Sequence, residues 1–547
     1  MKKIVLLLLT GLIWNSAIGQ KTYSNEEFNV RFGFPYEIPK GHQDLGYFGN
    51  PETGFAQISY KPKKELIIQS FDKNLKASKA KVIDISDFPA DFQSDAFLVI
   101  SNKYYWFFST YSKSEKKESL WAQEIDCAKG ELVGKRKELL ENSELEGDLV
   151  SMGGFYHFAK GNKYQFQTSI DSSKILITYR LLHKSKNDAV SKEQVGFCVI
   201  NESLTILDNN IITMPYTEKK MNIEDYEVDK NGNAFMLAKV FGDGEKKTKE
   251  KGKPEYHYEV FRLQHGSKDD LKNIKLDNES KYITDILITE QSTGDIIIAG
   301  FYSNKKQTRG TTFTSAVNSS DGVFLIKIDA NGTPLNYGKG YYEFPAEALK
   351  QFMSERAQKK LEKKEDKGEL EAKDLVMRKV IANADGSMEI LGEEYKVVSH
   401  TTYNGRSSTT YTNYYYDDIL DMRIDAKGEM VWTKKIPKRQ VGSAGRGSMS
   451  FYAFTQNSCT YLFYTDNIKN LKLSLDKEPA THNDNLGGYL VYYKIDPAGN
   501  ITKGDLFDYK REGIRFQPAN FERIGTKSIV NRAYKGKQSR VVIISQK

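Results

Sequence analysis

Short apolar runs joined by polar turns recur along most of this sequence. The segment VFLIKIDANGTPLNYGKGYY, residues 323–342, contains two such runs on either side of the turn Asp-Ala-Asn-Gly. The same arrangement returns in DMRIDAKGEMVWTKKI, from residue 421, and in LVYYKIDPAGNITKGDLFDY, from residue 490. Short runs rich in β-branched and aromatic residues and bounded by turn residues are typical of β-strands. The pattern therefore predicts a chain built from β-hairpins.

The hairpin turns mark a repeat with a mean spacing of about 71 residues. Counting clear and degenerate copies, the turns begin at Asp72, Asp126, Asn201, Gln264, Asp329, Asp425 and Asp496. A second hairpin precedes each turn, for example at residues 283–303 and 375–395. Each unit therefore contains four strands, and repeated four-stranded units are the signature of a β-propeller.

We predict an all-β fold, a seven-bladed β-propeller, with six or eight blades as alternatives because two of the turns match poorly. The first unit, from residue 54, lacks an obvious first strand, whereas the C-terminal segment 528–547 is strand material without a following turn. Pairing of these two ends in a closing blade would remove exposed sheet edges. The predicted domain covers residues 45–547, with a helical insertion at 345–368 and an N-terminal extension at 20–44.

The repeat units resemble a known kind of propeller repeat. A strand such as VFLIKIDANG, followed by a turn and a return strand, is similar to the repeats of secreted propeller proteins from Bacteroidota-type bacteria. The resemblance covers roughly residues 45–547. It implies the fold and says almost nothing about activity, because propellers host many unrelated functions.

The N-terminal segment MKKIVLLLLTGLIWNSAIGQ predicts a secretory signal peptide at residues 1–19. Lys2 and Lys3 precede a short apolar core, and Ala17-Ile18-Gly19 forms a small-residue cleavage site. The core is too short for a stable transmembrane helix, and no cysteine follows it for lipid attachment. We therefore expect a periplasmic or secreted protein with no transmembrane segment in the mature chain.

Charge and cysteine content exclude some classes of protein. The formal net charge of +8 falls to +6 without residues 1–19, which hold two lysines and no acid. This excess is too small for a nucleic-acid-binding surface. Cys127, Cys198 and Cys459 are an odd number without paired spacing, so disulfides do not build the fold, although one bridge between two of them remains open.

The Asp-x-x-Gly turn could be a repeated calcium loop or a structural turn. Calcium prefers six to eight oxygen ligands, and an EF-type loop needs acids at alternating positions followed by a distant Glu. DANGTPLNYGKG has no such series. A type I turn that ends in a left-handed residue explains both positions, because Gly accepts a positive φ and Asp accepts a backbone N–H two residues on. We interpret the turn as structural and predict no metal or cofactor residues.

Nearly all long insertions fall in loops that open on one face of the predicted propeller. These loops are residues 242–254, 303–322, 396–418 and 466–488. Long loops on one face of a rigid scaffold are where binding groups usually lie. The helical insertion from Pro345 belongs to the same side, and Leu349, Phe352, Met353 and Leu361 form one apolar stripe. This stripe either caps the propeller or binds a partner.

The segment TTYNGRSSTTYTNYYYDD, residues 401–418, is the most suggestive surface candidate. Asn404-Gly405 predicts a hairpin turn, with Arg406 at its tip and several tyrosines along the ribbon. Tyrosine supplies amphipathic contact area at interfaces. The alternative is an ordinary hairpin whose tyrosines pack on their neighbours. The candidate partner-binding residues are Phe352, Met353, Arg356, Tyr403, Arg406, Tyr411, Tyr414, Tyr415 and Tyr416.

Catalytic motifs are scarce in this sequence. The seven histidines are scattered, and HExxH, zinc-type cysteine, G-x-S-x-G and phosphate-loop patterns are absent. We therefore predict no catalytic residues and a non-catalytic, exported interaction or scaffold module, monomeric by itself. It would bind a protein partner through the long-loop face, as an accessory or plug of an outer-membrane or secretion complex. The alternative is a glycan- or peptide-acting enzyme with its active site in the central pocket of that face.

Overall fold

The computed structural model describes most of the chain after the predicted signal peptide. The signal peptide lies outside the described residues, as do parts of three of the long loops. The described residues are 21–547 except 39–40, 62–64, 84, 86–91, 113, 144, 147–148, 152–158, 162, 183–190, 243–253, 268–270, 307–318, 330–331, 368–369, 444–448, 476 and 484–486.

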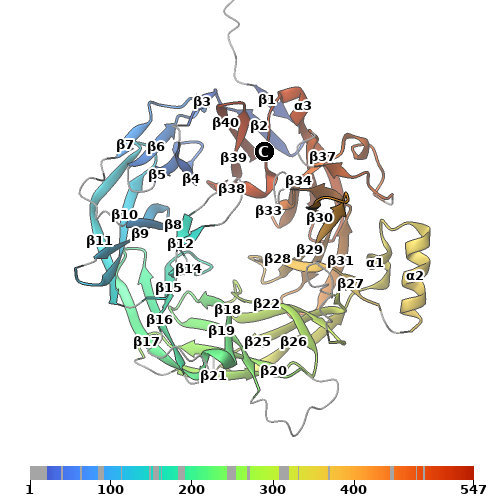
Figure 1. The fold of residues 1–547 in the computed structure, drawn as a ribbon, viewed down its shortest axis with the longest axis horizontal. Coiled ribbons are helices and arrows are strands. Elements are labelled where there is room, and N and C mark those ends of the chain that lie inside the picture. Colours follow the sequence, from blue (N-terminus) through green and yellow to red (C-terminus); the bar gives the residue numbers. More distant parts are fainter. Residues whose placement is uncertain are drawn as a thin grey trace, which may run out of the picture.

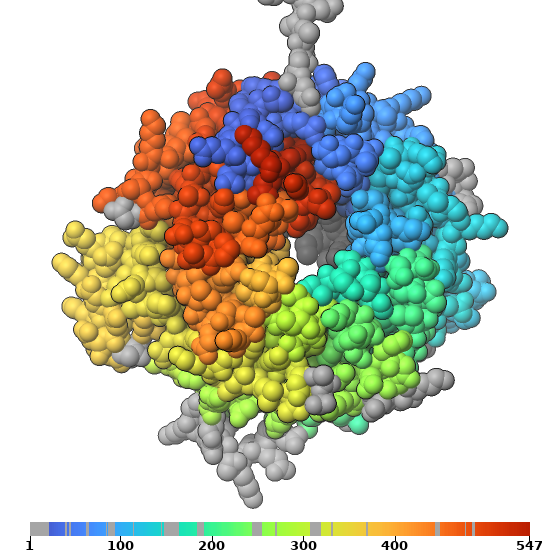
Figure 2. Space-filling view, turned by 180° about the vertical axis from the view of Figure 1, so that it is seen from behind, coloured from blue at the N-terminus to red at the C-terminus, as the bar shows by residue number. Residues whose placement is uncertain are grey.

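Antiparallel sheets follow one another around a ring, in the order of the sequence (Figure 1). The first sheet consists of β4 (Gln43–Asn50), β5 (Gly54–Lys61), β6 (Glu65–Phe71) and β7 (Lys81–Ile83). The second consists of β8 (Phe92–Ile100), β9 (Lys103–Ser112), β10 (Lys117–Asp126) and β11 (Glu131–Ser143). The third consists of β14 (Tyr164–Thr168), β15 (Lys174–Arg180), β16 (Lys192–Asn201) and β17 (Ile206–Thr217). Figure 2 shows the ring from behind, with a hollow at its centre.

The next sheets continue the same four-stranded plan. They are β18 (Met221–Val228), β19 (Ala234–Phe241), β20 (Tyr256–Leu263) and β21 (Leu271–Leu276); β22 (Tyr282–Glu290), β23 (Ile296–Ser303), β25 (Gly322–Ile328) and β26 (Pro334–Glu343); and β33 (Phe451–Gln456), β34 (Cys459–Asp466), β36 (Tyr489–Ile495) and β37 (Ile501–Asp508). Between the last two lies a six-stranded sheet of β28 (Leu375–Ala382), β29 (Met388–Tyr403), β30 (Ser408–Ile424), β31 (Met430–Ile436), β32 (Gln440–Gly442) and β35 (His482–Asn483).

One further sheet joins the two ends of the described chain. It combines β1 (Thr22–Ser24), β2 (Phe28–Phe32) and β3 (Tyr36–Glu37) with β38 (Glu522–Ile524), β39 (Ser528–Lys535) and β40 (Gln538–Gln546). Strand β2 pairs with β40 in antiparallel register, from Phe28 opposite Gln546 to Phe32 opposite Val542. Residues 22–37, predicted as an extension outside the domain, therefore contribute strands to a sheet.

The fold is an all-β propeller, and the predicted fold class is confirmed at this level. The described residues form eight sheets of at least four strands, so the predicted count of seven blades is not confirmed. The difference arises because β4, QDLGYFGN, contains two glycines and no β-branched residue, and this composition does not predict a strand. The first unit thus has its own inner strand, and β38–β40 belong to an additional sheet.

The remaining elements are short. Two small sheets pair β12 (Leu149–Ser151) with β13 (Ala159–Gly161) and β24 (Ser319–Ser320) with β27 (Ala372–Lys373). The α-helices among the described residues are α1 (Ala346–Lys350), α2 (Glu355–Glu365) and α3 (Tyr509–Glu512), and the 3-10 turns are η1 (Glu218–Lys220), η2 (Ile468–Asn470) and η3 (Pro518–Asn520). No helix in these ranges is long and apolar enough to cross a lipid bilayer.

The Asp-x-x-Gly turns have the structural role predicted for them. The carboxylate of Asp425 accepts the N–H groups of Lys427, at 2.8 Å, and Glu429, at 2.9 Å. The N–H of Gly428 donates to the Asp425 carbonyl at 3.0 Å, and Gly428 has a φ of 88°. The side chain and the glycine together therefore close the hairpin between β30 and β31.

Apolar side chains pack between neighbouring sheets and form the core. Phe28 of β2 meets Phe463 of β34 and Tyr492 of β36 edge to face, with ring centroids 5.3 and 5.0 Å apart. Such edge-to-face contacts add to the stabilisation from burial alone. The N-terminal strand is therefore anchored both by its pairing with β40 and by the adjacent sheet. The three cysteines are free thiols, and Cys127 and Cys198 are buried.

Carboxylates on the first strands of several sheets accept backbone N–H groups from the next sheet. Asp225 of β18 accepts the N–H of Ile288 at 3.1 Å, and Asp285 of β22 accepts the N–H of Met377 at 2.7 Å. Glu522 of β38 accepts the N–H of Tyr47 in β4. These contacts link adjacent sheets around the ring, and the last links the final sheet to the first.

The buried Glu522 carboxyl predicts a pH-dependent contribution to stability. Burial raises its pKa from 4.5 to about 7, and the N–H of Tyr47 opposes this only in part. At a pH between these two pKa values, Glu522 is protonated in the folded protein and ionised in the unfolded chain. The free energy of unfolding therefore falls as the pH rises from about 4.5 to about 7. Relative to the unsubstituted protein, Glu522→Gln should gain about 3 kcal/mol between about pH 4 and about pH 8. Urea unfolding of both proteins across this range measures the gain, and a difference independent of pH would contradict it.

Candidate partner-binding site

The hairpin of β29 and β30 extends well beyond its own sheet. Strand β31 pairs with β30 at residues 419–424, and β32 pairs with it at residues 414–416. We call residues 398–413, which lie beyond both contacts, the arm. In the arm β29 and β30 pair with each other from Val398 opposite Asn413 to Tyr403 opposite Ser408. The predicted ribbon is therefore present, and it is a free two-stranded projection among the described residues.

The tip of the arm is ordered by its own side chains. The amide oxygen of Asn404 accepts the N–H groups of Arg406, at 3.1 Å, and Ser407, at 2.9 Å. Gly405 has a φ of 85°, a conformation that glycine adopts without a steric penalty. The Tyr403 hydroxyl donates to the Gly405 carbonyl at 3.0 Å. The Asn-Gly turn predicted from the sequence is confirmed.

The two faces of the arm differ in chemistry. On one face, hydroxyl groups pair across the strands, Ser399 with Thr412 at 2.9 Å and Thr401 with Thr410 at 2.8 Å. On the other, the His400 ring stacks on Tyr411, with centroids 5.2 Å apart and planes at 25°. Cross-strand pairs of this kind stabilise a two-stranded ribbon. One face therefore carries Ser and Thr hydroxyls together with Tyr403 near the tip, and the other carries the stacked His400 and Tyr411 rings next to Thr402 and Thr409.

The structure separates the tyrosines predicted to bind a partner. Tyr403 at the tip is 74% exposed and Tyr411 is 49% exposed, whereas Tyr414 and Tyr415 are half-buried near the base. Tyr416 is only 3% exposed, and its ring lies 4.8 Å from that of Tyr395. Tyr416 therefore packs inside the protein and is not available to bind a partner. Its burial follows from pairing with β32, a contact that the sequence did not predict.

The base of the arm contains a buried ion pair that sequence reasoning missed. The side chains of Lys438 and Glu393 are both fully buried, with Nζ 2.8 Å from Oε1. The Lys438 ammonium also donates to the Tyr416 carbonyl at 2.8 Å, and Arg378 donates to the other oxygen of Glu393 at 2.7 Å. These bonds join β28, β29, β30 and the segment after β31. The arm is therefore fixed to the sheet by charge-assisted hydrogen bonds.

The predicted helical insertion forms α1 and α2 at the outer edge of the ring, beside β27 and β31 (Figure 1). Leu349 is buried in the cluster between the sheets of β22–β26 and β28–β31, and Leu361 packs against the same cluster. The apolar stripe is thus used to attach the helices to the propeller. Of the three predicted partner-binding residues here, Phe352 is 7% exposed, Met353 is half-buried and Arg356 is exposed.

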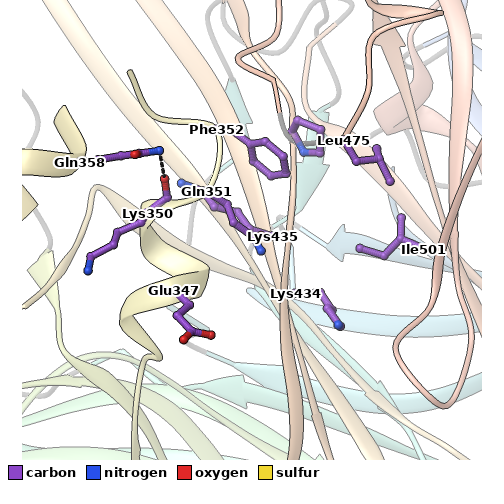
Figure 3. A pocket seen from close by; sticks show the side chains of 10 residues that line it. Glu347, Lys350, Gln351, Phe352, Gln358, Lys434, Lys435, Leu475 and Ile501 are labelled. Carbon is purple, nitrogen blue, oxygen red and sulfur yellow. Dashed lines mark hydrogen bonds between the residues drawn. The ribbon is translucent and has the colours of Figure 1, made fainter. Parts of the chain in front are cut away.

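A groove with a volume of about 500 Å³ lies between the helices and strands β31 and β37 (Figure 3). It is lined by Glu347, Lys350, Gln351, Phe352, Gln358, Lys434, Lys435, Pro437, Leu475 and Ile501. The Lys435 ammonium is already bound by Glu394, at 2.9 Å, and Asp418, at 3.0 Å. Burial raises the pKa of Asp418 to about 6, although Lys435 opposes this. The lining of the groove therefore combines apolar side chains with lysines. At Pro437 the groove lies next to the base of the arm.

The backbone of Phe352 is strained where it enters the groove. Its φ is 61°, a left-handed value that costs an L-residue with a β-carbon about 1–2 kcal/mol. Phe352→Ala keeps this strain, whereas Phe352→Gly removes it, and both variants lose the same ring. We expect the Gly variant to be more stable than the Ala variant by about 1 kcal/mol, the reverse of the usual order. Thermal unfolding of the pair measures this, and an Ala variant of equal or higher stability would show an unstrained backbone.

Acidic residues near the ring centre are engaged by the backbone. The Glu227 carboxylate accepts the N–H groups of Val228, at 2.9 Å, and Glu290, at 3.3 Å. Burial raises the pKa of Glu227 to about 8. The Glu290 carboxylate in turn accepts the N–H groups of Ile170 and Lys230, both at 3.0 Å. These carboxylates tie adjacent sheets together. Within the described ranges, no group of three or more His, Cys, Asp or Glu side chains is placed to hold a metal ion.

The sheets and their connections define a β-propeller domain with a projecting hairpin. No protein-family model and no curated protein matches the chain. Among solved structures, the chain is similar to the β-propeller domain of the Trilobed protease from Pyrococcus furiosus, at 12% identity and a TM-score of 0.33, covering 86% of this chain and 99% of that one. It is also similar to the WD40 domain of SCAP from fission yeast, at 10% identity and a TM-score of 0.36, covering 95% and 98%.

A third similar structure is prolyl oligopeptidase B from Galerina marginata bound to a macrocyclization substrate. Identity is 8% and the TM-score is 0.37, with 94% of this chain aligned. The chain spans 55% of the length of that peptidase. Similarity of this degree concerns the propeller alone and assigns no activity or partner.

Proposed function

We propose that this protein is a non-catalytic interaction module that binds a protein partner through the arm. The observation that carries the proposal is the free projection of residues 398–413 beyond the sheet, with exposed side chains from His400 to Tyr411. A two-stranded hairpin is marginally stable alone, yet this one is held in place by hydroxyl pairs, an ordered tip and a buried ion pair. Rigid presentation of exposed groups lowers the entropic cost of binding.

The exposed residues of the arm suit a protein interface. Tyrosine and arginine are enriched among residues that contribute most to binding, and Tyr403 and Arg406 lie together at the tip. Tyr403 is largely exposed, and its hydroxyl bond to Gly405 restricts its orientation. An aromatic anchor that is ordered before binding loses little freedom on contact. The tip is therefore the proposed centre of the interface.

The proposal includes a compartment and a kind of partner. The predicted signal peptide and the resemblance to secreted propeller proteins support a periplasmic or extracellular protein. A propeller with a projecting arm suits an accessory or scaffold subunit of an envelope complex, such as one in the outer membrane or a secretion system. The folded chain would act as a monomer that docks on this larger partner.

Site-specific photo-crosslinking tests the proposed interface. A photoreactive phenylalanine at position 403 should give one defined adduct in the native cell, and the same residue at position 468, an exposed isoleucine in another loop, should not. Replacing residues 401–410 by Asn-Gly should shorten the arm without altering the melting temperature greatly, because His400 and Tyr411 are already paired. A protein that combines the probe at position 468 with the shortened arm serves as a folded control that lacks the proposed interface. The absence of any adduct specific to position 403 would contradict the proposed function.

A further inference from the structure

We infer that the partner presents an extended acidic segment, which adds to the free edge of β29 in the arm as a third strand. This inference rests on the proposed function and names the chemistry of its partner. Strand addition joins main-chain hydrogen bonds with side-chain specificity. The argument depends on the direction of the backbone groups of the arm and on the position of its charges.

The direction of the backbone groups follows from two hydrogen bonds at the ends of the hairpin. The Tyr395 N–H donates to the Asp374 carbonyl at 2.7 Å, outside the hairpin, whereas the Asn404 N–H donates across it to Ser407 at 3.2 Å. Between these two residues the register is unbroken. In an antiparallel pair successive residues alternate in direction, so the N–H and C=O groups of Ser399, Thr401 and Tyr403 point away from β30.

These outward groups form an unpaired edge. Among the described residues, Ser399, Thr401 and Tyr403 have no backbone hydrogen bond outside the hairpin. Natural proteins usually shorten, cover or charge such an edge, because an exposed edge is a template for another strand. Here the edge is ordered and exposed from residue 400 to the tip. The cross-strand partners Ser408, Thr410 and Thr412 form the corresponding edge of β30.

The charges of β29 and of the tip indicate the chemistry of the partner. Residues 396–416 contain Lys396, His400 and Arg406 and no Asp or Glu. Lys396 and His400 lie on β29, four residues apart on the same face, whereas β30 has only uncharged residues from 408 to 416. The Lys396 ammonium leans toward β30, 3.9 Å from Asp417 and 5.2 Å from the ring centroid of Tyr415, and Arg406 adds a charge at the tip. Carboxylates on alternate residues of a strand along β29 would therefore meet Arg406 at the tip of the arm and Lys396 just beyond its base.

The same charges argue against a second copy of this chain as the occupant. Two arms paired edge to edge would bring like charges together at Arg406 and Lys396, and like charges placed opposite each other destabilise a strand pair. A basic segment would meet the same repulsion. An extended segment with Glu or Asp at alternate positions is therefore the occupant that the edge favours.

A pair of proline variants isolates the backbone contribution. Thr401 and Thr410 lie directly opposite each other, both with outward N–H groups, and share one hydroxyl hydrogen bond. Thr401→Pro and Thr410→Pro remove the same hydroxyl pair and no hydrogen bond between the two strands, because only outward N–H groups are lost. We expect Thr401→Pro to weaken partner binding at least about tenfold and Thr410→Pro to change it less than about twofold, since one bond of about 1.4 kcal/mol corresponds to tenfold.

The two variants are compared in two assays. In the first, each carries the photoreactive residue at position 403, and the yield of the native adduct is measured. In the second, a fluorescent peptide with alternating Thr-Glu-Val-Glu residues and a matched peptide with Lys for Glu are titrated into the full-length protein. The expected result is loss of the adduct and of acidic-peptide binding in Thr401→Pro alone, with the Lys peptide binding at least about tenfold more weakly throughout.

Each other outcome overturns the inference in a recognisable way. Equal losses in the two variants would mean that the edge of β29 is not used, and a loss confined to Thr410→Pro would place the partner on β30. Equal affinity for the Glu peptide and the Lys peptide would contradict the inference that the partner segment is acidic. If both proline variants keep the native adduct at position 403, the proposed interface stands and strand addition fails. If the unsubstituted protein gives no such adduct, the proposed function itself fails.

Discussion

Lys438→Met is expected to lower the free energy of unfolding by about 3–5 kcal/mol. The substitution leaves the Glu393 carboxylate fully buried and without its lysine, while Arg378 and Ser450 still donate to its other oxygen. A buried charge that loses its partner costs far more than the ion pair itself contributes. Urea or thermal unfolding measures the loss, and the arm should become more accessible to protease because Lys438 also holds the Tyr416 carbonyl.

A matched lysine controls for the general effect of removing a positive charge. Lys396→Met changes a lysine of the same sheet whose side chain is 44% exposed and whose ion pair with Asp417 is long, at 3.9 Å. An exposed pair of this kind contributes at most about 1 kcal/mol. The double variant Lys438→Met/Glu393→Gln should be less destabilised than the sum of the two single variants, since no unpaired carboxylate remains. Similar losses in Lys438→Met and Lys396→Met would contradict the role given to the buried pair.

Gly428→Ala is expected to cost roughly 3 kcal/mol or more, from two causes that add. At a φ of 88° any residue with a β-carbon is strained. The added β-carbon would also lie 2.4 Å from the backbone nitrogen of Gly338 and 2.5 Å from the carbonyl carbon of Tyr337, in the neighbouring sheet. Backbone at this distance cannot move aside without shifting one sheet against the other.

Gly332, in the equivalent turn of the preceding sheet, provides the control. Its φ is 78°, but its nearest neighbour would be the flexible end of Lys272, at 3.0 Å. Gly332→Ala should therefore show the conformational penalty alone, about 1–2 kcal/mol. Measured melting temperatures should place the Gly428 variant well below the Gly332 variant. Equal losses would mean that the contact between the sheets at Gly428 gives way easily.

The hairpins and their turns could be predicted because their signals are local. The Asp425 and Gly428 pair and the Asn404-Gly405 tip both rest on backbone conformations that only a few residue types favour. The extra sheet could not be predicted in the same way. Strand β4 lacks β-branched residues, and β2 is recognisable only once its partner β40, far along the sequence, is known.

The candidate site was predictable only in its exposed part. Tyr403, Arg406 and Tyr411 were placed correctly on a ribbon because the ribbon follows from a local turn. The burial of Tyr416 and the ion pair between Glu393 and Lys438 depend on β32 and on chain segments that are not adjacent in sequence. The left-handed backbone of Phe352 carries no sequence signal, since phenylalanine rarely adopts it.

The pairing of β2 with β40 has a consequence for how the chain reaches its folded state. The two strands come from opposite ends of the described sequence, Phe28 opposite Gln546, so their contact has one of the largest loop-closure costs available to this chain. A growing polypeptide cannot make this sheet until β40 has left the ribosome. Until then β2 presents an unpaired edge, and contacts of such long sequence separation form slowly. Assembly of the ring is therefore expected to end at this sheet, which makes its completion the step most exposed to misfolding and to protection by chaperones.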